Sequence, residues 1–464
     1  MKYDLPPEFA ERMKRLLGAD YPDFLSAYHL PYRRGLRVNT LKCSIDKFTQ
    51  LFPYAITQSP FCAGGYYLEE ELRAGADPLH HAGAYYMQEP SATAAVTILD
   101  PKPGERVLDL CAAPGGKSTQ IAAALKGSGL LWANEIIRSR AQILAQNIER
   151  CGVRNAVVSC TDAAAIGKGL SGFFDAVLID APCSGEGMFR KEPAALSEWS
   201  EDNIGMCARR QTEILEAAAD TLMEGGRLLY STCTFAPEEN ELQIARFLNA
   251  HPDFELVDLS GTSFGRPGFS WAQVKEFSDQ AYPCYPLQYT RRILPGDGGE
   301  GHFIALLKRN GTNAVLYGGY PYITNDTNSI RFYSLYKECF RSPESGIPQT
   351  IGDIVRVVPE GLPSLRGLGV ISAGAAGAEI CKNRLEPCHA IFMAAANAED
   401  CVSVLDMNAD DPRLLSFLKG ETIDAPGCSG WTAVAVYGII TGFGKVSGGI
   451  LKNRYPKGLR LRNG

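Results

Sequence analysis

The alternation of short apolar runs with amphipathic stretches between residues 100 and 250 constrains the fold most. The apolar runs lie at 106–110, 129–135, 155–162, 174–182 and 226–234. Amphipathic stretches typical of helices lie at 117–127, 138–152, 202–224 and 237–252. This order is the signature of βαβ units. We therefore predict an α/β fold with a mainly parallel sheet, to which 299–309 adds a late strand in an antiparallel hairpin.

The length of 464 residues exceeds that of one domain, since about 100–200 residues per domain is usual. Residues 1–95 begin with a helix at 7–17 and continue with a basic stretch, loops and short strands. Residues 96–310 hold the α/β pattern. A polar, Gly- and Tyr-rich segment at 310–330 suggests a boundary, so we expect a small α+β linker domain at 311–390 and a further α+β domain at 391–464.

Charge and cysteine usage exclude several classes of protein. The net charge of −6 excludes an overall basic coat for nucleic acid but not local basic patches. No apolar run approaches the roughly 18 residues of a membrane helix, and the start lacks a signal-peptide core, so we expect a cytoplasmic protein without membrane contact. Fourteen cysteines without a CxxC pair, and only six histidines, give a metal site little support and predict reduced thiols.

A glycine-rich loop, DLCAAPGGKST at 109–119, follows the first strand of the pattern. Such a loop between strand and helix suits close approach of the backbone to a ligand. A phosphate-binding P-loop would need glycine at position 111, where the chain has Cys111, and the G-x-G-x-x-G fingerprint is also absent. The loop could instead hold S-adenosylmethionine, which has no phosphate.

Acidic residues follow the next strands. Glu135 lies 20 residues after Gly115, Asp162 ends the third apolar run and Asp180 ends the fourth. Ligands of doubly wound sheets bind at the carboxyl ends of the strands, so these acids, with Asp109, should line one crevice. Acids are also common as helix N-caps, which explains any one of them equally well. Four in series beside a glycine loop favour a binding site.

Two cysteines follow two strands that we expect to be neighbours. Cys183 stands in DAPCSG after the fourth run, and Cys233 in STCT after the fifth. Neighbouring strands lie about 5 Å apart, so the two thiols could face one pocket, although a cysteine is more often inert core filling. Near a methyl donor, a thiolate can add to carbon 6 of a pyrimidine and activate carbon 5 for methylation, after which the thiol is eliminated.

The motifs CAAPGGK, DAPCSG and STCT, in this order, resemble those of the RNA cytosine-5 methyltransferases of the RsmB/RsmF and NSUN group. LRVNTLK (36–42), GAYYMQEPSA (83–92) and EGHFIALLKR (300–309) agree with this resemblance, which covers about residues 1–310. The tail ILKNRYPKGLR (450–460) resembles the PUA-like RNA-binding end of RsmF-type 16S rRNA methyltransferases. An RsmB-type enzyme would carry an extra N-terminal RNA-binding domain.

The resemblance implies a Rossmann-like methyltransferase domain at 96–310, an RNA-binding or substrate segment at 1–95 and a PUA-like domain at 391–464. It implies S-adenosylmethionine as cofactor, with Glu135 and Arg140 at its ribose, Asp162 at its adenine and Asp180 between donor and target base. The donor loop would comprise Cys111, Ala112, Ala113, Pro114, Gly115, Gly116 and Lys117. Lys117 would contact the flipped cytosine, or would only be a charge partner at the start of the helix.

By the same resemblance Cys233 is the nucleophile and Cys183 assists product release, whereas a DNA-type enzyme would exchange the two roles. The basic tail would contact RNA phosphates through Lys445, Lys452, Arg454, Lys457 and Arg460. The implied function is methylation of carbon 5 of cytosine in RNA, with 16S rRNA or the small ribosomal subunit as the partner of a monomeric enzyme. Two alternatives are a tRNA cytosine-5 methyltransferase and a catalytically inactive PUA-containing ribosome-assembly factor. A P-loop NTPase is disfavoured by Cys111.

Overall fold

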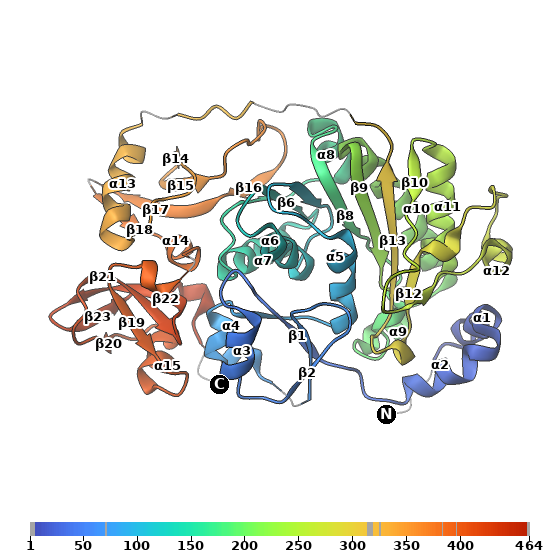
Figure 1. The fold of residues 1–464 in the computed structure, drawn as a ribbon, viewed down its shortest axis with the longest axis horizontal. Coiled ribbons are helices and arrows are strands. Elements are labelled where there is room, and N and C mark those ends of the chain that lie inside the picture. The colour runs from blue at the N-terminus through green and yellow to red at the C-terminus, as the bar shows by residue number, and fades with distance from the viewer. Residues whose placement is uncertain are drawn as a thin grey trace.

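A computed structural model describes the arrangement of the chain (Figure 1). The described residues are 5–69, 72–312, 319–323, 326–382, 384–395 and 397–461. Parts of the predicted boundary, 313–318 and 324–325, lie outside the described residues, as does Arg462, a further basic residue two positions after Arg460.

The centre of the protein is one large sheet in which five parallel strands lie side by side. Their order is β9 (Leu222–Thr232), β8 (Phe174–Asp180), β5 (Arg106–Asp109), β6 (Leu130–Asn134) and β7 (Ala156–Ser159). The chain order reverses between β5 and β8, so this pair forms the switch point at which doubly wound sheets bind ligands. The predicted α/β Rossmann-like fold is confirmed.

Antiparallel strands extend the sheet beyond β9. The predicted late strand is β13 (His302–Arg309), which pairs with β9 and is followed by β12 (Arg291–Ile293) and β11 (Arg266–Pro267). β10 (Phe254–Leu256) also pairs with β13. The hairpin expected for 299–309 is therefore formed with β12.

Helices cover both faces of the sheet because successive strand residues point to opposite sides. Val107 packs with α5 (Ala94–Leu99), α6 (Gly116–Leu125) and α7 (Arg138–Arg150), whereas Leu108 belongs to the core on the other face. That face carries α8 (Ala163–Gly169), α10 (Glu201–Thr221) and α11 (Glu241–Ala250).

Two predicted helices begin or end differently in the structure. The helix predicted to reach 224 ends at Thr221, because Leu222 already pairs with Phe174 of β8 and a register shift accommodates the extra residues. The helix predicted from 237 begins at Glu241. Pro237–Glu239 form a 3-10 turn instead, and the backbone of Asn240 is not helical.

The N-terminal segment contains α1 (Pro7–Leu17), as predicted, and α2 (Tyr21–Tyr28), which pack beside β12 and α9 (Pro193–Glu198) (Figure 1). A separate sheet follows, in the order β2 (Ile56–Gln58), β3 (Gly65–Leu68), β1 (Gly35–Val38) and β4 (Tyr85–Met87). α3 (Ile45–Leu51) and α4 (Pro78–His81) accompany this sheet.

Two further sheets form the C-terminal third. The first is β14 (Ile347–Ile351), β15 (Ile354–Val358), β17 (Ala375–Cys381) and β18 (Arg384–Pro387), with α13 (Thr327–Cys339) beside it. The short helix α12 (Trp271–Val274) belongs to the central domain, between β11 and β12. The second is β19 (Val404–Met407), β21 (Gly430–Val436), β22 (Ile439–Ser447), β23 (Ile450–Asn453) and β20 (Ile423–Asp424). α14 (His389–Met393) lies between them, and α15 (Pro412–Lys419) packs on the second sheet.

The C-terminal third is joined to the rest of the chain at several points. β16 (Val370–Ala373) comes from the predicted linker domain but pairs antiparallel with β7 at the edge of the central sheet. One hydrophobic core contains Leu36 and Phe48 of the N-terminal segment together with Leu405 and Phe417. The Nδ1 atom of His81 lies 2.7 Å from the Tyr455 hydroxyl.

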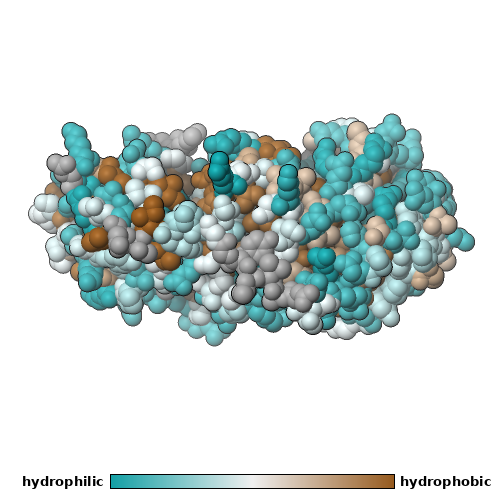
Figure 2. Space-filling view, turned by 90° about the horizontal axis from the view of Figure 1, so that it is seen from above, coloured by the Kyte–Doolittle hydropathy of each residue, from teal (hydrophilic) through white to brown (hydrophobic). Residues whose placement is uncertain are grey.

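The outer surface differs between the two ends of the molecule. Seen from above, hydrophilic residues cover most of the side that carries α10 to α12, and apolar residues show in patches towards the C-terminal segments (Figure 2). Within the described part of the chain, no helix is long and apolar enough to cross a membrane.

Candidate active site

The two cysteines meet at the carboxyl ends of β8 and β9. These strands pair in parallel with Asp180 opposite Ser231, so the loops that follow them start side by side. The sulfur atoms of Cys183 and Cys233 lie 3.3 Å apart, and both residues line one cavity. All fourteen cysteines carry free thiols. The thiols thus face one pocket, as the expected strand order predicts.

A buried polar network holds the two cysteine loops together. The hydroxyl oxygens of Ser184 and Thr234 lie 2.8 Å apart. The carboxylate of Glu186 accepts hydrogen bonds from the Thr234 hydroxyl (2.9 Å) and the Phe235 backbone N–H (2.8 Å). Glu239 accepts from the Ser184 backbone N–H at 3.0 Å and from the Ser184 hydroxyl. The separation of the two thiols is therefore set by side chains of both loops.

Sequence reasoning missed Glu186 and Glu239. Both are almost completely buried, at 2% and 0% exposure, although each stands in a polar stretch that reads as surface. The available signal was their position after the cysteines, three residues after Cys183 in PCSGE and six after Cys233 in CTFAPEE. Buried acids need hydrogen-bond partners, and here those partners are the neighbours of the cysteines.

The titration of Glu239 yields a testable prediction. Burial raises its pKa from 4.5 to about 7, despite the hydrogen bonds from Ser184 and Gln211. A raised acid pKa stabilises the fold below pH 4.5, and this contribution is lost as the pH rises through 7. Glu239→Gln resembles the protonated acid, because its amide can donate to the Ser184 hydroxyl. The midpoint of thermal unfolding should therefore fall less between about pH 5 and pH 8 in Glu239→Gln than in the wild type.

Differential scanning calorimetry at both pH values measures this difference. Glu238→Gln, which changes the neighbouring and more exposed acid, is the control and should keep the wild-type profile. An equal fall in wild type and Glu239→Gln would show that Glu239 is ionised throughout.

Lys117 and Asp180 form an ion pair between α6 and β8. The Lys117 Nζ atom lies 2.7 Å from Asp180 Oδ2, and Asp180 Oδ1 accepts a hydrogen bond from the Ser231 hydroxyl at 2.9 Å. Burial opposes both charges, but their mutual attraction outweighs it, so the pKa of Lys117 is raised and that of Asp180 is lowered. Asp180 lines the cavity and Lys117 does not. In the structure Lys117 is thus the charge partner of Asp180, and its contact with a base stays a prediction.

The loop before α6 presents only part of its length to the cavity. Cys111 and Ala113 line it, whereas Ala112, Pro114, Gly115 and Gly116 lie behind. Gly115 has φ 113°, a conformation that side chains rarely adopt, and it precedes the first turn of α6. One side of the loop can therefore be approached closely by a ligand in the cavity, and the other side packs against the protein.

The backbone of this loop is held by side chains from two elements, β1 and α7. Arg37 donates to the Gly116 carbonyl (3.2 Å), Asn147 to the Pro114 carbonyl (2.9 Å) and Arg140 to the Ala113 carbonyl (3.0 Å). Arg37 is 2% exposed although it belongs to the basic N-terminal stretch. The sequence predicted an RNA-binding or substrate segment at 1–95 as a whole and did not indicate this packing role of Arg37.

The predicted acids occupy different positions. Glu135 is 3% exposed, accepts the Ile137 N–H at 2.9 Å and lies 3.4 Å from Arg140. Asp162 lines the cavity and also caps α8 by accepting the Ala165 N–H at 2.7 Å, so its role as a helix cap is confirmed and its contact with a ligand stays a prediction. Glu135 and Asp180 also line the cavity.

Asp109 corrects the sequence prediction, because it does not line the crevice. It is fully buried beneath the loop, where its Oδ2 accepts the Ser118 hydroxyl at 2.6 Å. Burial raises the pKa of Asp109 to about 7. The last residue of β5 points into the packing between strand and helix, and Leu110 and Cys111 reach the cavity instead.

The cavity has a volume of about 950 Å³ and runs from the cysteines past the ends of β5 and β6. Ile136 and Ile137 provide an exposed apolar wall near Glu135. α9 and α10 form the opposite wall and contribute the acids Glu198 and Glu213. Within the described residues, no group of three or more His, Cys, Asp or Glu side chains could hold a metal ion.

The predicted basic tail lies in the last sheet, away from this cavity. Lys445 of β22 stands opposite Lys452 of β23. Arg454 pairs with Glu386 at 2.9 Å, Arg460 donates to the Tyr455 carbonyl at 3.3 Å, and Lys457 is exposed. The Lys445 Nζ atom lies over the Trp431 ring, so three of the five tail residues already have partners within the protein.

Comparison with known families gives three matches along the chain. Residues 96–308 match 16S rRNA methyltransferase RsmB/F, residues 5–90 match the N-terminal domain of 16S rRNA methyltransferase RsmF, and residues 404–461 match the methyltransferase RsmF PUA domain. The three matches follow the order of the three predicted regions.

Similar proteins support the same assignment. Ribosomal RNA small subunit methyltransferase F of Serratia proteamaculans is 39% identical over 66% of this chain, and the chain spans 63% of that relative's length. The protein of the same name from Escherichia fergusonii is 36% identical, with 68% of this chain and 67% of the relative covered. A crystal structure of a methyltransferase homologue from Pyrococcus horikoshii has a TM-score of 0.58 and 30% identity, covering 66% of this chain and 96% of its own. The chain thus belongs to the RsmB/F family of 16S rRNA methyltransferases.

Proposed function

We propose that the protein transfers a methyl group from S-adenosylmethionine to carbon 5 of a cytosine in RNA, with 16S rRNA as the substrate. The observation that carries this proposal is the pair of thiols 3.3 Å apart in an acid-lined cavity at the switch point of the sheet. The family membership and the relatives named ribosomal RNA small subunit methyltransferase F support the choice of RNA.

The cavity residues fit S-adenosylmethionine. Glu135 and Asp162 offer carboxylates at successive strand ends, where hydroxyls of a ribose can donate hydrogen bonds. Ile136 and Ile137 offer an apolar wall for an adenine ring. When bound, S-adenosylmethionine supplies an electrophilic methyl group.

The protein's own residues would prepare the base. In the proposed mechanism the thiolate of Cys233 adds to carbon 6 of a cytosine flipped into the pocket, which gives carbon 5 the electrons to form the new bond. Asp180 is held ionised by Lys117 and can accept a hydrogen bond from the amino group of cytosine. The carbon-5 proton then passes to a water molecule, the electrons of its bond re-form the double bond between carbon 5 and carbon 6, and the Cys233 sulfur leaves as a thiolate.

Cys183 is suited to assist that last step. Its hydrogen bond with Cys233 and its burial raise the pKa of the Cys183 thiol well above its ordinary value. Cys183 thus keeps its proton, and a protonated thiol beside the Cys233 sulfur can support the departure of that sulfur.

Methyl transfer to defined RNAs tests this function. The protein is incubated with methyl-labelled S-adenosylmethionine and with transcribed 16S rRNA, small ribosomal subunits or tRNA, and bisulfite sequencing then locates the modified cytosines. We expect 5-methylcytosine in 16S rRNA. Modification of tRNA alone would identify a tRNA enzyme, and binding of small subunits without methylation of any RNA would identify an inactive assembly factor.

The basic tail is proposed to contact RNA phosphates, and single substitutions test this. Deleting the tail would remove β23, whose Leu451 is fully buried, so Lys452→Glu and Lys457→Glu are preferable. Each should weaken binding of 16S rRNA fragments and lower the dependence of the affinity on salt by roughly one phosphate contact. Filter binding at several salt concentrations measures both, with Lys168→Glu on α8 as the control. Unchanged affinity and salt dependence in both tail variants would leave the tail without an RNA contact.

A further inference from the structure

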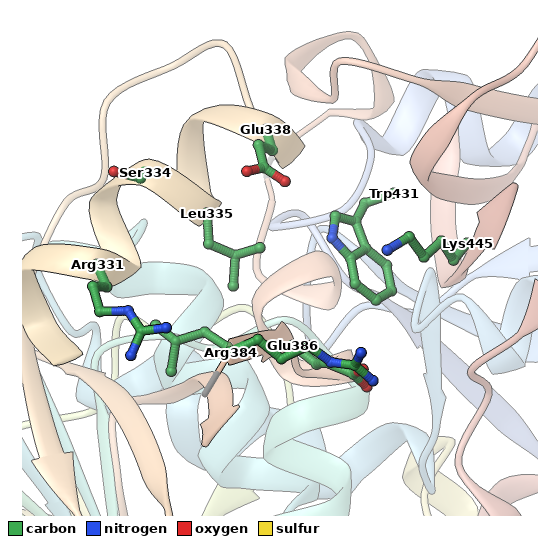
Figure 3. A pocket seen from close by; sticks show the side chains of 9 residues that line it. Arg331, Ser334, Leu335, Glu338, Arg384, Glu386, Trp431 and Lys445 are labelled. Carbon is green, nitrogen blue, oxygen red and sulfur yellow. The ribbon is translucent and has the colours of Figure 1, made fainter. Parts of the chain in front are cut away.

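A second cavity lies where α13 and β18 meet the last sheet (Figure 3). Its volume is about 300 Å³, at the lower end of the range for small-ligand pockets. One wall comes from α13, whose lining residues recur at the spacing of a single helix face: Arg331, Ser334, Leu335 and Glu338. β18 and strands β21 and β22 supply the remaining walls through Arg384, Leu385, Glu386, Trp431 and Lys445.

The floor of this cavity is apolar and aromatic. Leu335 and Trp431 are 8% and 7% exposed, and Figure 3 shows both side chains directed towards the space between α13 and the last sheet. Lys445 stands opposite Trp431 in the sheet, and its Nζ atom lies 4.7 Å from the centre of the Trp431 ring. The Arg454 guanidinium also lies over this ring, 5.9 Å from its centre, so a base at this floor would lie against the cations that cover the ring, and a cation is attracted to the face of an aromatic ring.

The rim of the cavity carries both signs of charge. Arg331, Arg384 and Lys445 are the cations, and Glu338 and Glu386 the carboxylates. The Glu386 side chain is only 12% exposed and accepts ion pairs from Arg384 (2.6 Å) and from Arg454 (2.9 Å). The Arg384 side chain remains 74% exposed, so its guanidinium can pair with Glu386 and still meet a second anion.

A basic path leads from the cavity along the last sheet. Lys445 at the rim stands opposite Lys452, and Arg454 follows β23. Phosphates are held by such rows of cations, whereas carboxylates at a pocket can accept hydrogen bonds from the amino groups of bases. Such a row of cations beside a pocket with carboxylates suits a polymer of nucleotides better than an isolated phosphate. The bases of a polymer can donate hydrogen bonds to the carboxylates, whereas an isolated phosphate offers the carboxylates only a like charge.

We propose that this cavity binds one nucleotide of a single-stranded segment of the substrate RNA, with its base over the Leu335–Trp431 floor and its phosphates on Arg384 and Lys445. The site is distinct from the cysteine cavity and is composite, since α13 and β18 supply seven of its nine lining residues and the last sheet supplies the other two. The inference rests on the proposed function in one respect, namely that RNA is the substrate.

Filling the cavity tests the proposal. Ser334 is exposed on the lining face of α13, so Ser334→Trp can occupy the space without changing charge, and Ser334→Ala is the matched control. The probe is a fluorescein-labelled single-stranded RNA of about twelve nucleotides, a length within the usual site size of such surfaces. Ser334→Trp should raise the dissociation constant of the full-length protein at least fivefold, and Ser334→Ala less than twofold.

Two charge-reversal variants on the same helix, one inside the cavity and one outside it, provide an independent measurement. Arg331→Glu should weaken RNA binding at least fivefold, whereas Lys337→Glu, an equal change of charge on α13 outside the cavity, should weaken it less than twofold. Photocrosslinking of RNA that contains 4-thiouridine should place crosslinks on the peptides of Leu385 or Trp431. Circular dichroism of each variant checks that it is folded.

The outcomes separate this site from the proposed function. Equal affinity of wild type and Ser334→Trp, with no crosslink at Leu385 or Trp431, overturns the inference even if the wild type methylates 16S rRNA. If the wild type transfers no methyl group but the affinities change as expected, the pocket stands and the proposed reaction fails. If the wild type binds neither the oligonucleotide nor 16S rRNA, both are overturned.

Discussion

Replacing Cys233 with alanine is expected to lower the rate of methyl transfer roughly a thousandfold or more and to leave no covalent protein–RNA complex. Cys233→Ala removes the only thiol that the proposed mechanism uses to attack carbon 6. Replacing Cys183 should have a different result. Cys183→Ala keeps the attacking thiol and loses the neighbour 3.3 Å away that assists its departure. The reaction should then stop after methylation with the RNA still attached.

A denaturing gel with labelled RNA distinguishes these variants, because a covalent complex migrates as a shifted band. Cys207→Ala is a suitable control, since Cys207 is a buried cysteine of α10 that does not line the cavity. A shifted band in Cys233→Ala but not in Cys183→Ala would exchange the two roles, as in a DNA-type arrangement. Activity in both variants, without any covalent complex, would remove thiol addition from the mechanism.

The second large effect is expected at the ion pair between Asp180 and Lys117. Asp180→Ala leaves the ammonium group of Lys117 without its partner. The Asp180 side chain is 36% exposed, so we expect a loss of stability below the about 3–5 kcal/mol that breaking a fully buried pair costs. We expect both S-adenosylmethionine binding and methyl transfer to be lost. Glu135→Ala removes only an acceptor from the cavity, so it should weaken binding of S-adenosylmethionine roughly ten- to a hundredfold.

Isothermal titration calorimetry measures these affinities. Glu216→Ala on α10, an exposed acid that does not line the cavity, is the control and should bind as the wild type does. Asp180→Asn preserves the shape of the side chain and separates loss of charge from loss of packing. If Asp180→Ala and Glu135→Ala both bind the donor like the wild type, the cavity is not the donor site.

The strands and helices of the central domain could be predicted because their patterns are local. Val107 and Leu108 show how alternate residues of one strand meet opposite layers, which is the reason a short apolar run there indicates a strand buried on both faces. The end of α10 was misplaced because Leu222 and Met223 suit a helix as well as a strand. Pairing with β8, which no local pattern reveals, decides between the two.

The site could be predicted as far as single motifs reach. The meeting of Cys183 and Cys233 follows from two strand ends and the order of the sheet. The burial of Glu239 does not follow, since its fate depends on Ser184 and Gln211, which are distant in sequence. Asp109 was misassigned for a related reason: the last residue of a strand can face the ligand or the helix behind it, and the sequence does not show which.

The attachment of β16 to β7, together with the core that Leu36 and Phe48 share with Leu405 and Phe417, has a consequence for how a target nucleotide is chosen. β16 joins the segment before the last sheet to the edge of the catalytic sheet, and the common core joins the last sheet to the N-terminal segment, so the distance between the last sheet and the two cysteines is held nearly constant. A flexible tether would let any nearby cytosine reach the thiols. Under the proposed function, a fixed distance would favour a cytosine at one spatial offset from the RNA bound at the last sheet, so the fold of the RNA would help to choose the target.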